Sequence, residues 1–315
     1  MKVAICGTWH VHAGHYTHTA KNTNGIEVVG VFEENEKWKH EFAKTFDIPA
    51  FDTFDDLLKS DADMVIVCTS TNKHPYYIKE IAKAKKDVFT EKVLALTVEE
   101  CEEIKKIIEE NGVGFVISFV HKCAGGIRTI MKLIKDGAVG KVNYVRFRNA
   151  HGGSFADWLP EHFYNKEECG GGAMIDLGAH GMYLIDDILG LPEKYSSTFN
   201  ICAPVAKNKD RVEDHAVTVM TYADGSIAIN ETGFVSPNNP CMIEVSGELG
   251  FISYCEERGV ELNNESTDYD LKKVEMLPDI PEPLEQMLSG TILEGCGIDE
   301  AIDLTRMMTG AYKGV

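Results

Sequence analysis

The sequence predicts a two-domain α/β protein in which a doubly wound parallel sheet is followed by an α+β domain with mostly antiparallel strands. Residues 1–121 alternate short apolar runs with helical patterns, which is typical of βαβ units. After residue 122, two helical segments give way to strands of alternating polarity separated by turn signals. The length of 315 residues also suits two domains. We therefore expect domains over residues 1–121 and 122–315.

The first domain contains apolar runs of the kind found in strands that are covered on both faces. They lie at residues 3–6, 28–32, 64–68, 87–89 and 115–117. The segments between them predict helices. The clearest has a capping box formed by Thr97 and Glu100 and ends at Asn111-Gly112.

The second domain is marked by a predicted hairpin in which residues 215–222 and 226–231 flank Asp224-Gly225. Further strands are expected at residues 142–148, 242–245 and 251–254. Residues 256–285 are acidic and predict loops and edge structure, and a closing helix is expected over residues 298–312.

Composition excludes several classes of partner. Asp and Glu number 50 against 31 Lys and Arg, and a formal charge of −19 repels nucleic acid and anionic lipid. The sequence shows neither a long apolar stretch nor a secretory leader, so we expect a cytoplasmic protein without a membrane partner. Nine cysteines without a C-x-x-C pair argue against disulfides and a thiolate zinc site.

The turn after the first strand partly matches a dinucleotide-binding fingerprint. Gly7 supplies the first glycine, but Trp9 and His12 replace the second and third. Glu33 ends the second strand, where a carboxylate holds the adenosine ribose, and Glu34 follows it. Two negative charges there favour NAD over NADP, which carries a 2′-phosphate. The alternative is a strand-to-helix turn that binds no ligand.

The same turn contains His10-x-His12, with His15 and His18 nearby. Such a pair after a first strand often seats a divalent metal at the mouth of a (β/α)₈ barrel, which makes a metal-dependent hydrolase the rival function. A barrel needs eight strand-helix alternations, and this chain turns to hairpins after about residue 140. We therefore expect no metal.

Two further segments contain side chains suited to catalysis. Glu91-Lys92 follows a strand at the ligand-binding edge of the sheet, where a lysine can polarise a hydroxyl or carbonyl, although such pairs also occur as solvated surface pairs. Behind three glycines at 170–172, the residues Asp176, His180, Tyr183 and Asp187 form one polar stripe along an apolar helix. A carboxylate one turn before an imidazole suits acid-base chemistry, and a hydrogen-bonded core network is the alternative.

Taken together, these motifs resemble the Gfo/Idh/MocA oxidoreductases, which include glucose-fructose oxidoreductase and inositol 2-dehydrogenase. The matching segments are the degenerate glycine turn, the acidic end of the second strand, and residues 69–74, 91–97, 170–180, 212–215 and 244–251. The resemblance implies an NAD(P)-binding Rossmann domain and a C-terminal α/β domain with a large open sheet that forms a homodimer or homotetramer. It also implies that Lys92, Asp176 and His180 are catalytic and that Glu33 binds ribose.

The chain departs from the family pattern in and around the predicted site. Ser70 and Val93 replace prolines, and Tyr183 replaces the aspartate that usually follows the histidine by three residues. In the family the bond after the lysine is typically a cis Lys-Pro bond. Because the other site residues are retained, we expect Lys92 to keep its position and the Lys92-Val93 bond to be cis.

The predicted function is an NAD-preferring dehydrogenase that acts on a secondary alcohol of a sugar, cyclitol or derivative. A cofactor- or sugar-sensing homologue without catalysis, an NAD-dependent glycosidase and the metal-dependent hydrolase remain as alternatives. The predicted cofactor-binding residues are Gly7, Thr8, Trp9, His10, Val11, Glu33, Thr69, Ser70, Thr71, His74 and Glu91. The predicted substrate contacts are Lys92, Lys122, His151, Trp158, Asp176, His180 and Tyr183.

Overall fold

The computed structural model describes residues 1–156, 158–203, 208–236, 241–291 and 294–314. It divides into two compact units. Met1–Ser118 and Pro281–Thr305 form unit 1, and Phe119–Ile280 and Arg306–Val315 form unit 2.

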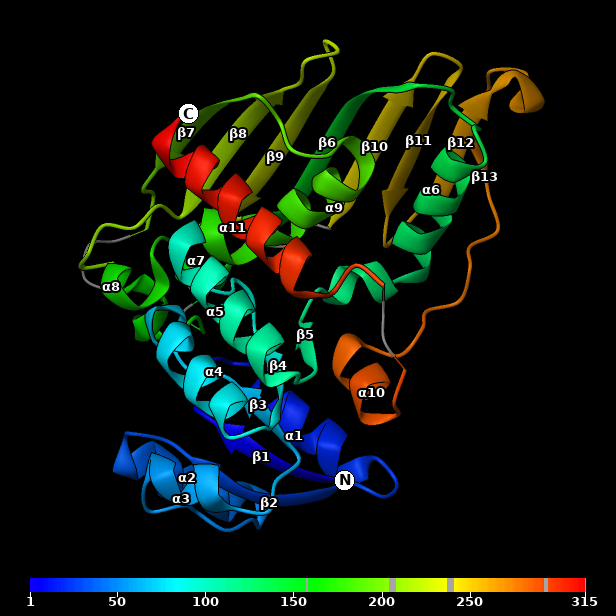
Figure 1. Ribbon diagram of the computed structural model, residues 1–315. Helices are drawn as coiled ribbons and strands as arrows, with labels where there is room; N and C mark the ends of the chain where they lie inside the picture. Colours follow the sequence, from blue (N-terminus) through cyan, green and yellow to red (C-terminus); the bar gives the residue numbers. More distant parts are fainter. Residues whose placement is uncertain (157, 204–207, 237–240, 292–293, 315) are drawn as a thin grey trace. The chain divides into compact units, whose positions relative to one another are not determined.

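Unit 1 contains a parallel sheet of strand order β2-β1-β3-β4-β5 (Figure 1). The strands are β1 (Lys2–Cys6), β2 (Glu27–Phe32), β3 (Met64–Val67), β4 (Asp87–Thr90) and β5 (Phe115–Ile117), which confirms the predicted doubly wound sheet. Because β2 and β3 flank β1, the strand order reverses beside β1, where doubly wound sheets bind ligands outside the carboxyl ends of the strands.

The helices of unit 1 cover both faces of this sheet, as the fully apolar strands require. Residues 3–5 of β1 and 64–67 of β3 are completely buried. Asn35 caps one helix, and Thr97 caps another by accepting a hydrogen bond from the backbone N–H of Glu100. The helices are α1 (Ala13–Asn22), α2 (Glu36–Phe46), α3 (Phe54–Lys59), α4 (His74–Lys83) and α5 (Val98–Asn111).

The segment Pro281–Thr305, which was predicted to lie in the second domain, belongs to unit 1. Its helix α10 (Pro283–Leu288) contacts α1 and β5. Lys105 pairs with Asp299 at 2.6 Å, and the backbone N–H of Ile117 donates to the carbonyl of Cys296 at 2.9 Å. The chain thus returns to unit 1 after some 160 residues in unit 2. Hydrophobic periodicity reports only on local structure, so it did not indicate this return.

Unit 2 contains an eight-stranded sheet of order β13-β12-β11-β10-β6-β9-β8-β7, with helices on one face (Figure 1). Neighbouring strands are antiparallel except β6 and β9, and the predicted hairpin is β8 and β9. Residues 256–285 supply β12 and β13 at one edge, and β7 at the other edge is a polar strand that the sequence pattern did not predict. The strands are β6 (Val142–Ala150), β7 (Lys194–Asn200), β8 (His215–Thr221), β9 (Ile227–Gly233), β10 (Met242–Gly247), β11 (Gly250–Cys255), β12 (Gly259–Asn264) and β13 (Lys272–Lys273).

The two faces of the unit 2 sheet differ in polarity. Val145 and Phe147 of β6 are fully buried on the face covered by α9 (Ala179–Leu189), while α6 (Gly125–Lys135) packs on β11 and β12. On the other face, Arg146 pairs with Glu231 at 2.7 Å. This alternation is expected for an antiparallel sheet with one covered face. The last helix, α11, spans Ile298–Lys313.

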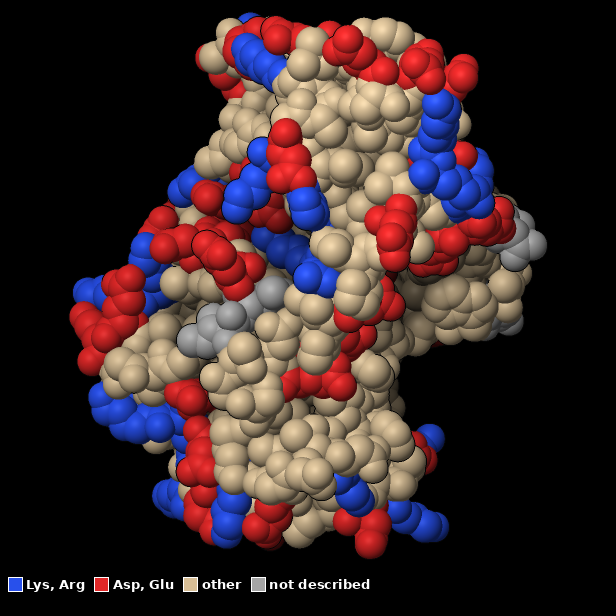
Figure 2. All heavy atoms as spheres, turned by 90° about the vertical axis from the view of Figure 1, so that its right-hand side faces the viewer, with Lys and Arg blue, Asp and Glu red and all other residues tan. Residues whose placement is uncertain are grey.

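Acidic residues outnumber basic ones in this chain, and charged side chains of both signs lie on its surface. On the face drawn in Figure 2, acidic and basic side chains are interspersed around uncharged areas. Within the described part of the chain, no helix has both the length and the apolar character needed to cross a membrane.

Candidate functional site

The turn between β1 and α1 is built around Gly7. Its φ of +86° is a conformation that favours glycine, and a Cβ at this position would lie 2.5–2.8 Å from atoms of Thr69. The backbone N–H of His10 donates to the carbonyl of Cys68 at 3.0 Å. The turn is therefore packed directly against the end of β3. Trp9 is half-buried and Val11 is exposed.

Glu33 folds back onto this turn. Its carboxylate accepts hydrogen bonds from the Thr8 backbone N–H at 2.7 Å, the Thr8 hydroxyl at 3.1 Å and the Asn35 backbone N–H at 2.9 Å. Glu34 pairs with Lys73 and accepts a hydrogen bond from Tyr77. Lys73 lies beyond the end of β3, 39 positions after Glu34. Local sequence patterns do not indicate a pair so far apart in the chain.

His74 joins the loops that follow β3 and β4. Its Nδ1 lies 3.1 Å from the carbonyl oxygen of Val93 and 3.2 Å from that of Leu94, and its Nε2 lies 3.2 Å from that of Thr69. The ring is buried, and burial lowers the pKa of His74. The contacts of this predicted cofactor-binding residue are thus with backbone, and they hold the buried loop Thr69, Ser70 and Thr71 beside Val93.

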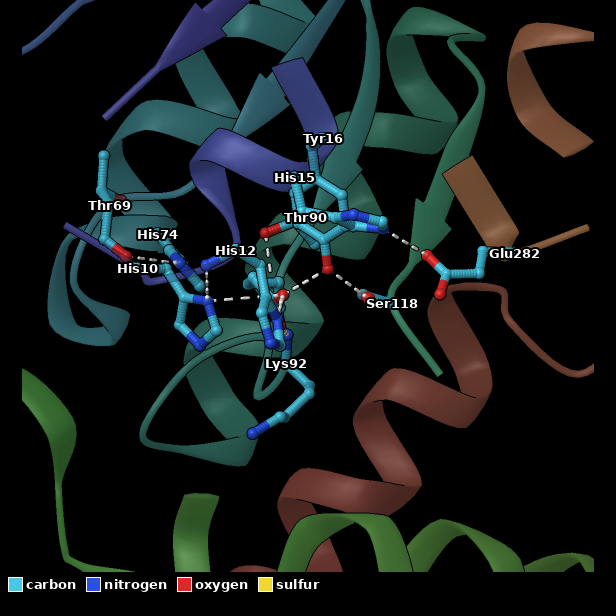
Figure 3. Close-up of polar contacts among 11 residues, drawn as sticks. His10, His12, His15, Tyr16, Thr69, His74, Thr90, Lys92, Ser118 and Glu282 are labelled. Carbon is cyan, nitrogen blue, oxygen red and sulfur yellow. Dashed lines mark hydrogen bonds and ion pairs between the residues drawn. The ribbon is translucent and has the colours of Figure 1, made fainter. Parts of the chain in front are cut away.

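Glu91 contacts a group of polar side chains that includes His10, His12 and Tyr16, which are labelled in Figure 3. Its Oε1 is 2.7 Å from Nδ1 of His12 and 3.5 Å from Nδ1 of His10, and it also accepts a hydrogen bond from Tyr16. The hydroxyls of Tyr16 and Ser118 are 2.7 Å apart. Burial would raise the pKa of Glu91, but the positive charges of His10, His12 and Lys92 hold it well below its usual range.

Lys92 follows this carboxylate, and its backbone N–H donates to Oε2 of Glu91 at 3.0 Å. The Lys92-Val93 peptide bond is cis, which confirms that prediction. The Lys92 side chain extends away from the imidazoles of His10 and His12 (Figure 3).

In unit 2, the glycines before Asp176 are required by close packing. A Cβ on Gly171 would lie 2.0 Å from the hydroxyl of Tyr312, and one on Gly172 would lie 1.9 Å from the carbonyl oxygen of Glu213. The Glu213 carboxylate accepts from the backbone N–H groups of Gly172 at 2.9 Å and Met174 at 3.0 Å, and from the Tyr312 hydroxyl at 2.6 Å. These contacts fix the start of the helix that carries Asp176.

That helix differs from the regular α-helix that the spacing predicted. Met174–Gly178 is a π-helical turn, and α9 begins only at Ala179. The Asn230 side chain donates to the carbonyl of Gly178 at 2.7 Å, so a polar partner from β9 binds where the two helical geometries meet. Such π-helical turns are frequent at functional sites, and this one changes the angle between Asp176 and His180 from that of an α-helix.

His180 is oriented by Tyr183. Its Nδ1 lies 3.0 Å from the Tyr183 hydroxyl oxygen, which also accepts from the backbone N–H of His121 at 3.2 Å. The rings of Tyr183 and Phe119 are stacked with centroids 4.2 Å apart, and the rings of His121 and His180 meet edge to face at 4.5 Å.

Lys122 extends this group. Its ammonium pairs with Asp187 at 2.8 Å and lies 5.7 Å from the centre of the Tyr183 ring. The structure therefore brings together three of the predicted substrate residues of unit 2, Lys122, His180 and Tyr183, together with Asp187 from the predicted stripe.

His151 and Trp158 form a separate pair, with ring centroids 4.6 Å apart. His151 also stacks on Phe234, at 5.1 Å. Three side chains that contact the predicted site residues were not predicted from the sequence: His121, Phe119 and Tyr16. Each is followed or preceded by ordinary apolar or helical sequence, so their only signal was the residue type itself.

Comparison with known proteins identifies the family of this chain. Residues 1–119 match the model of an oxidoreductase family with an NAD-binding Rossmann fold, and residues 127–253 match the Gfo/Idh/MocA C-terminal domain. The chain is 27% identical over 176 residues, 56% of its length, to the 2,7-anhydro-N-acetylneuraminate hydratase of Mediterraneibacter gnavus, and the match covers 46% of that protein. It thus spans about half the length of this curated relative.

Two other similarities concern dehydrogenases. The chain is 24% identical over 207 residues to the inositol 2-dehydrogenase of Rhizobium meliloti, covering 61% of this chain and 62% of that protein. A levoglucosan dehydrogenase solved with NADH and levoglucosan has the same fold, with a TM-score of 0.83 at 15% identity and coverage of 100% of this chain and 96% of that one. Because the two family models together match most of its length, the chain belongs to the Gfo/Idh/MocA family of oxidoreductases.

Proposed function

We propose that the protein is an NAD-preferring dehydrogenase that oxidises a secondary alcohol of a sugar, cyclitol or derivative, or reduces the corresponding ketone. The observation that carries this proposal is the anchored imidazole of His180, whose Nδ1 lies 3.0 Å from the Tyr183 hydroxyl, in a chain that retains Asp176 and Lys92. The inositol dehydrogenase and levoglucosan dehydrogenase relatives support a substrate of this class.

His180 acts as the base in this proposal. With Nδ1 directed at the Tyr183 oxygen, proton transfer to and from substrate falls to Nε2. For Nε2 to accept a proton, Nδ1 must be protonated and donate its hydrogen bond to the Tyr183 oxygen. That oxygen has a second lone pair, which accepts the His121 backbone N–H. Asp176 would hold a substrate hydroxyl, and Lys92 would stabilise the negative charge on the reacting oxygen.

The β1–α1 turn fits a dinucleotide. Gly7 keeps the backbone tight against Thr69, and Glu33 directly follows β2 and binds the turn through Thr8. When bound there, NAD supplies the hydride acceptor. Glu33 and the predicted residues Thr8, Trp9, His10, Val11, Thr69, Ser70 and Thr71 would hold it, while His74 and Glu91 would fix the loops around it. Glu33 and Glu34 favour NAD, since Lys73 is already paired with Glu34.

We further propose that Lys122, His151, Trp158 and Tyr183 shape the substrate site and that the uncovered face of the unit 2 sheet joins copies of the chain into a dimer or tetramer. That face carries the Arg146–Glu231 pair, which offers directional contacts for a partner. Light scattering on the purified protein measures the assembly directly, and a monomer at micromolar concentration would contradict it.

An NAD-dependent glycosidase or related lyase is the second candidate, because one relative is a hydratase of an anhydro sugar. The two functions differ in their net redox change. A dehydrogenase accumulates reduced nicotinamide in proportion to product, whereas a reaction with transient oxidation returns the hydride and accumulates none.

The test is a panel of sugars, polyols and glycosides with NAD and with NADP, followed by nicotinamide absorbance and by product analysis. We expect reduced nicotinamide to accumulate with at least one polyol or sugar. His180→Ala should lower kcat by about 10²- to 10⁴-fold while NAD affinity stays unchanged. Product formation without reduced nicotinamide would favour the second candidate, and full activity of His180→Ala would remove the proposed base.

A further inference from the structure

We propose that His10, His12 and Glu91, here called the His-His-Glu cluster, form a binding site for a divalent cation of the Zn²⁺ class. The proposal goes beyond the dehydrogenase function and does not depend on it. The sequence led us to expect no metal because the chain lacks the eight strand-helix alternations of the barrel in which a His-x-His pair seats a metal, and the sequence pattern pointed to no third ligand. The structure supplies that ligand from the end of β4.

The three residues present one donor atom each, and these atoms all lie within 4.8 Å of one another. Two imidazoles and one carboxylate are the protein ligands of many catalytic zinc ions, which keep a further position open. Glu91 and His10 are buried, whereas the side chain of His12 is 44% exposed. The cluster is thus closed on one side and accessible through His12 on the other.

The surroundings provide the outer hydrogen bonds that metal ligands require. Tyr16 donates to Oε1 of Glu91 and is itself 2.7 Å from the Ser118 hydroxyl, and the Lys92 backbone N–H donates to Oε2. Partners of this kind orient ligands and contribute to affinity.

The charges near the cluster permit a cation. The Glu91 carboxylate contributes a negative charge that would offset part of the cation's charge. Lys92 is the nearby ammonium, and its side chain extends away from the two imidazoles (Figure 3). His15, near the start of α1, is directed instead at Glu282, 2.9 Å away. His15 is therefore a matched control.

The experiment titrates the metal-free protein with ZnCl₂ by calorimetry, without dinucleotide. We expect one saturable site per chain in the wild type and in His15→Ala. His12→Ala removes a ligand, and Tyr16→Phe removes an outer partner of Glu91. Loss of such an outer partner should weaken binding by about 10- to 100-fold, and loss of the ligand should weaken it more.

Cobalt(II) identifies the ligands, because Cys202 is exposed and could bind zinc by itself. A cobalt complex with d–d bands but without thiolate charge-transfer bands would support the cluster. Thiolate bands, the absence of saturable binding, or equal affinity in His12→Ala and His15→Ala would each overturn the proposal. Because no step uses NAD or substrate, these results leave the proposed dehydrogenase activity to its own test.

Discussion

Replacing Tyr183 by phenylalanine removes a single oxygen from the centre of the unit 2 site while keeping the ring that stacks on Phe119 at 4.2 Å. That oxygen contacts Nδ1 of His180 at 3.0 Å and the backbone N–H of His121 at 3.2 Å. If His180 is the base, the variant keeps the base but loses the hydrogen bond that fixes its ring and tautomer. Tyr183→Phe should therefore retain activity at a reduced rate.

The size of the effect follows from the two hydrogen bonds of the Tyr183 oxygen. A hydrogen bond between uncharged groups contributes about 0.5 to 1.5 kcal/mol net, so removal of the bond to His180 should lower kcat by about 2- to 13-fold. The folded variant lacks both hydrogen bonds, and its free energy of unfolding should fall by about 1 to 3 kcal/mol. Binding of NAD should be unchanged.

The assay is steady-state kinetics as a function of pH with the substrate found in the panel, together with denaturant unfolding. Tyr222→Phe is the control, because in the described part of the chain the Tyr222 hydroxyl is buried without a hydrogen-bond partner. This control should leave kcat and its pH profile unchanged. A wild-type rate and pH profile in Tyr183→Phe would refute the anchoring of His180, and a decrease in kcat of about 10³-fold or more would show that Tyr183 itself takes part in the chemistry.

Three further predictions concern the cofactor and the glycine segment. Glu33→Arg should shift the ratio of dissociation constants toward NADP, and an unchanged ratio would exclude Glu33 from cofactor selection. Burial raises the pKa of Glu213, so its contribution to stability is complete below about pH 4.5 and is lost as the pH rises through the raised value. The stability of the wild type should thus fall relative to Glu213→Gln over that interval in denaturant titrations, and a parallel pH dependence would contradict this. Gly172→Ala places a Cβ 1.9 Å from the Glu213 carbonyl oxygen and should cost about 1 to 3 kcal/mol in the same assay. Gly14→Ala, in α1, is its control, since the new Cβ would lie 3.3 Å from the side-chain ring of Phe46 rather than against backbone. Equal losses of stability in both variants would refute the packing argument.

Local features of the sequence determined most of unit 1. Apolar runs such as residues 64–67 predict buried parallel strands because both faces of such strands must be covered, and Thr97 marks the start of a helix through a contact three residues away. Gly7 and Glu33 could be identified because each lies at the end of a strand, and strand ends are visible in the sequence. The sequence shows that residue 172 is a glycine but not why a glycine is needed there. The reason is the carbonyl oxygen of Glu213, which leaves no room for a Cβ.

The tertiary structure decided which of these residues meet. His12 and Glu91 are 79 positions apart, Lys73 reaches Glu34 across 39, and Tyr312 reaches Glu213 across 99. Periodicity and capping reflect interactions within a few residues, so they contain no information on such pairs. The same limit applies to the π-helical turn at Met174–Gly178, whose last carbonyl accepts a hydrogen bond from a side chain of β9. It applies also to the segment Pro281–Thr305, which packs with unit 1. The sequence by itself determined the residue types of the site and the strands and helices that carry them. The positions of their side chains depended on packing between segments that are distant in the chain.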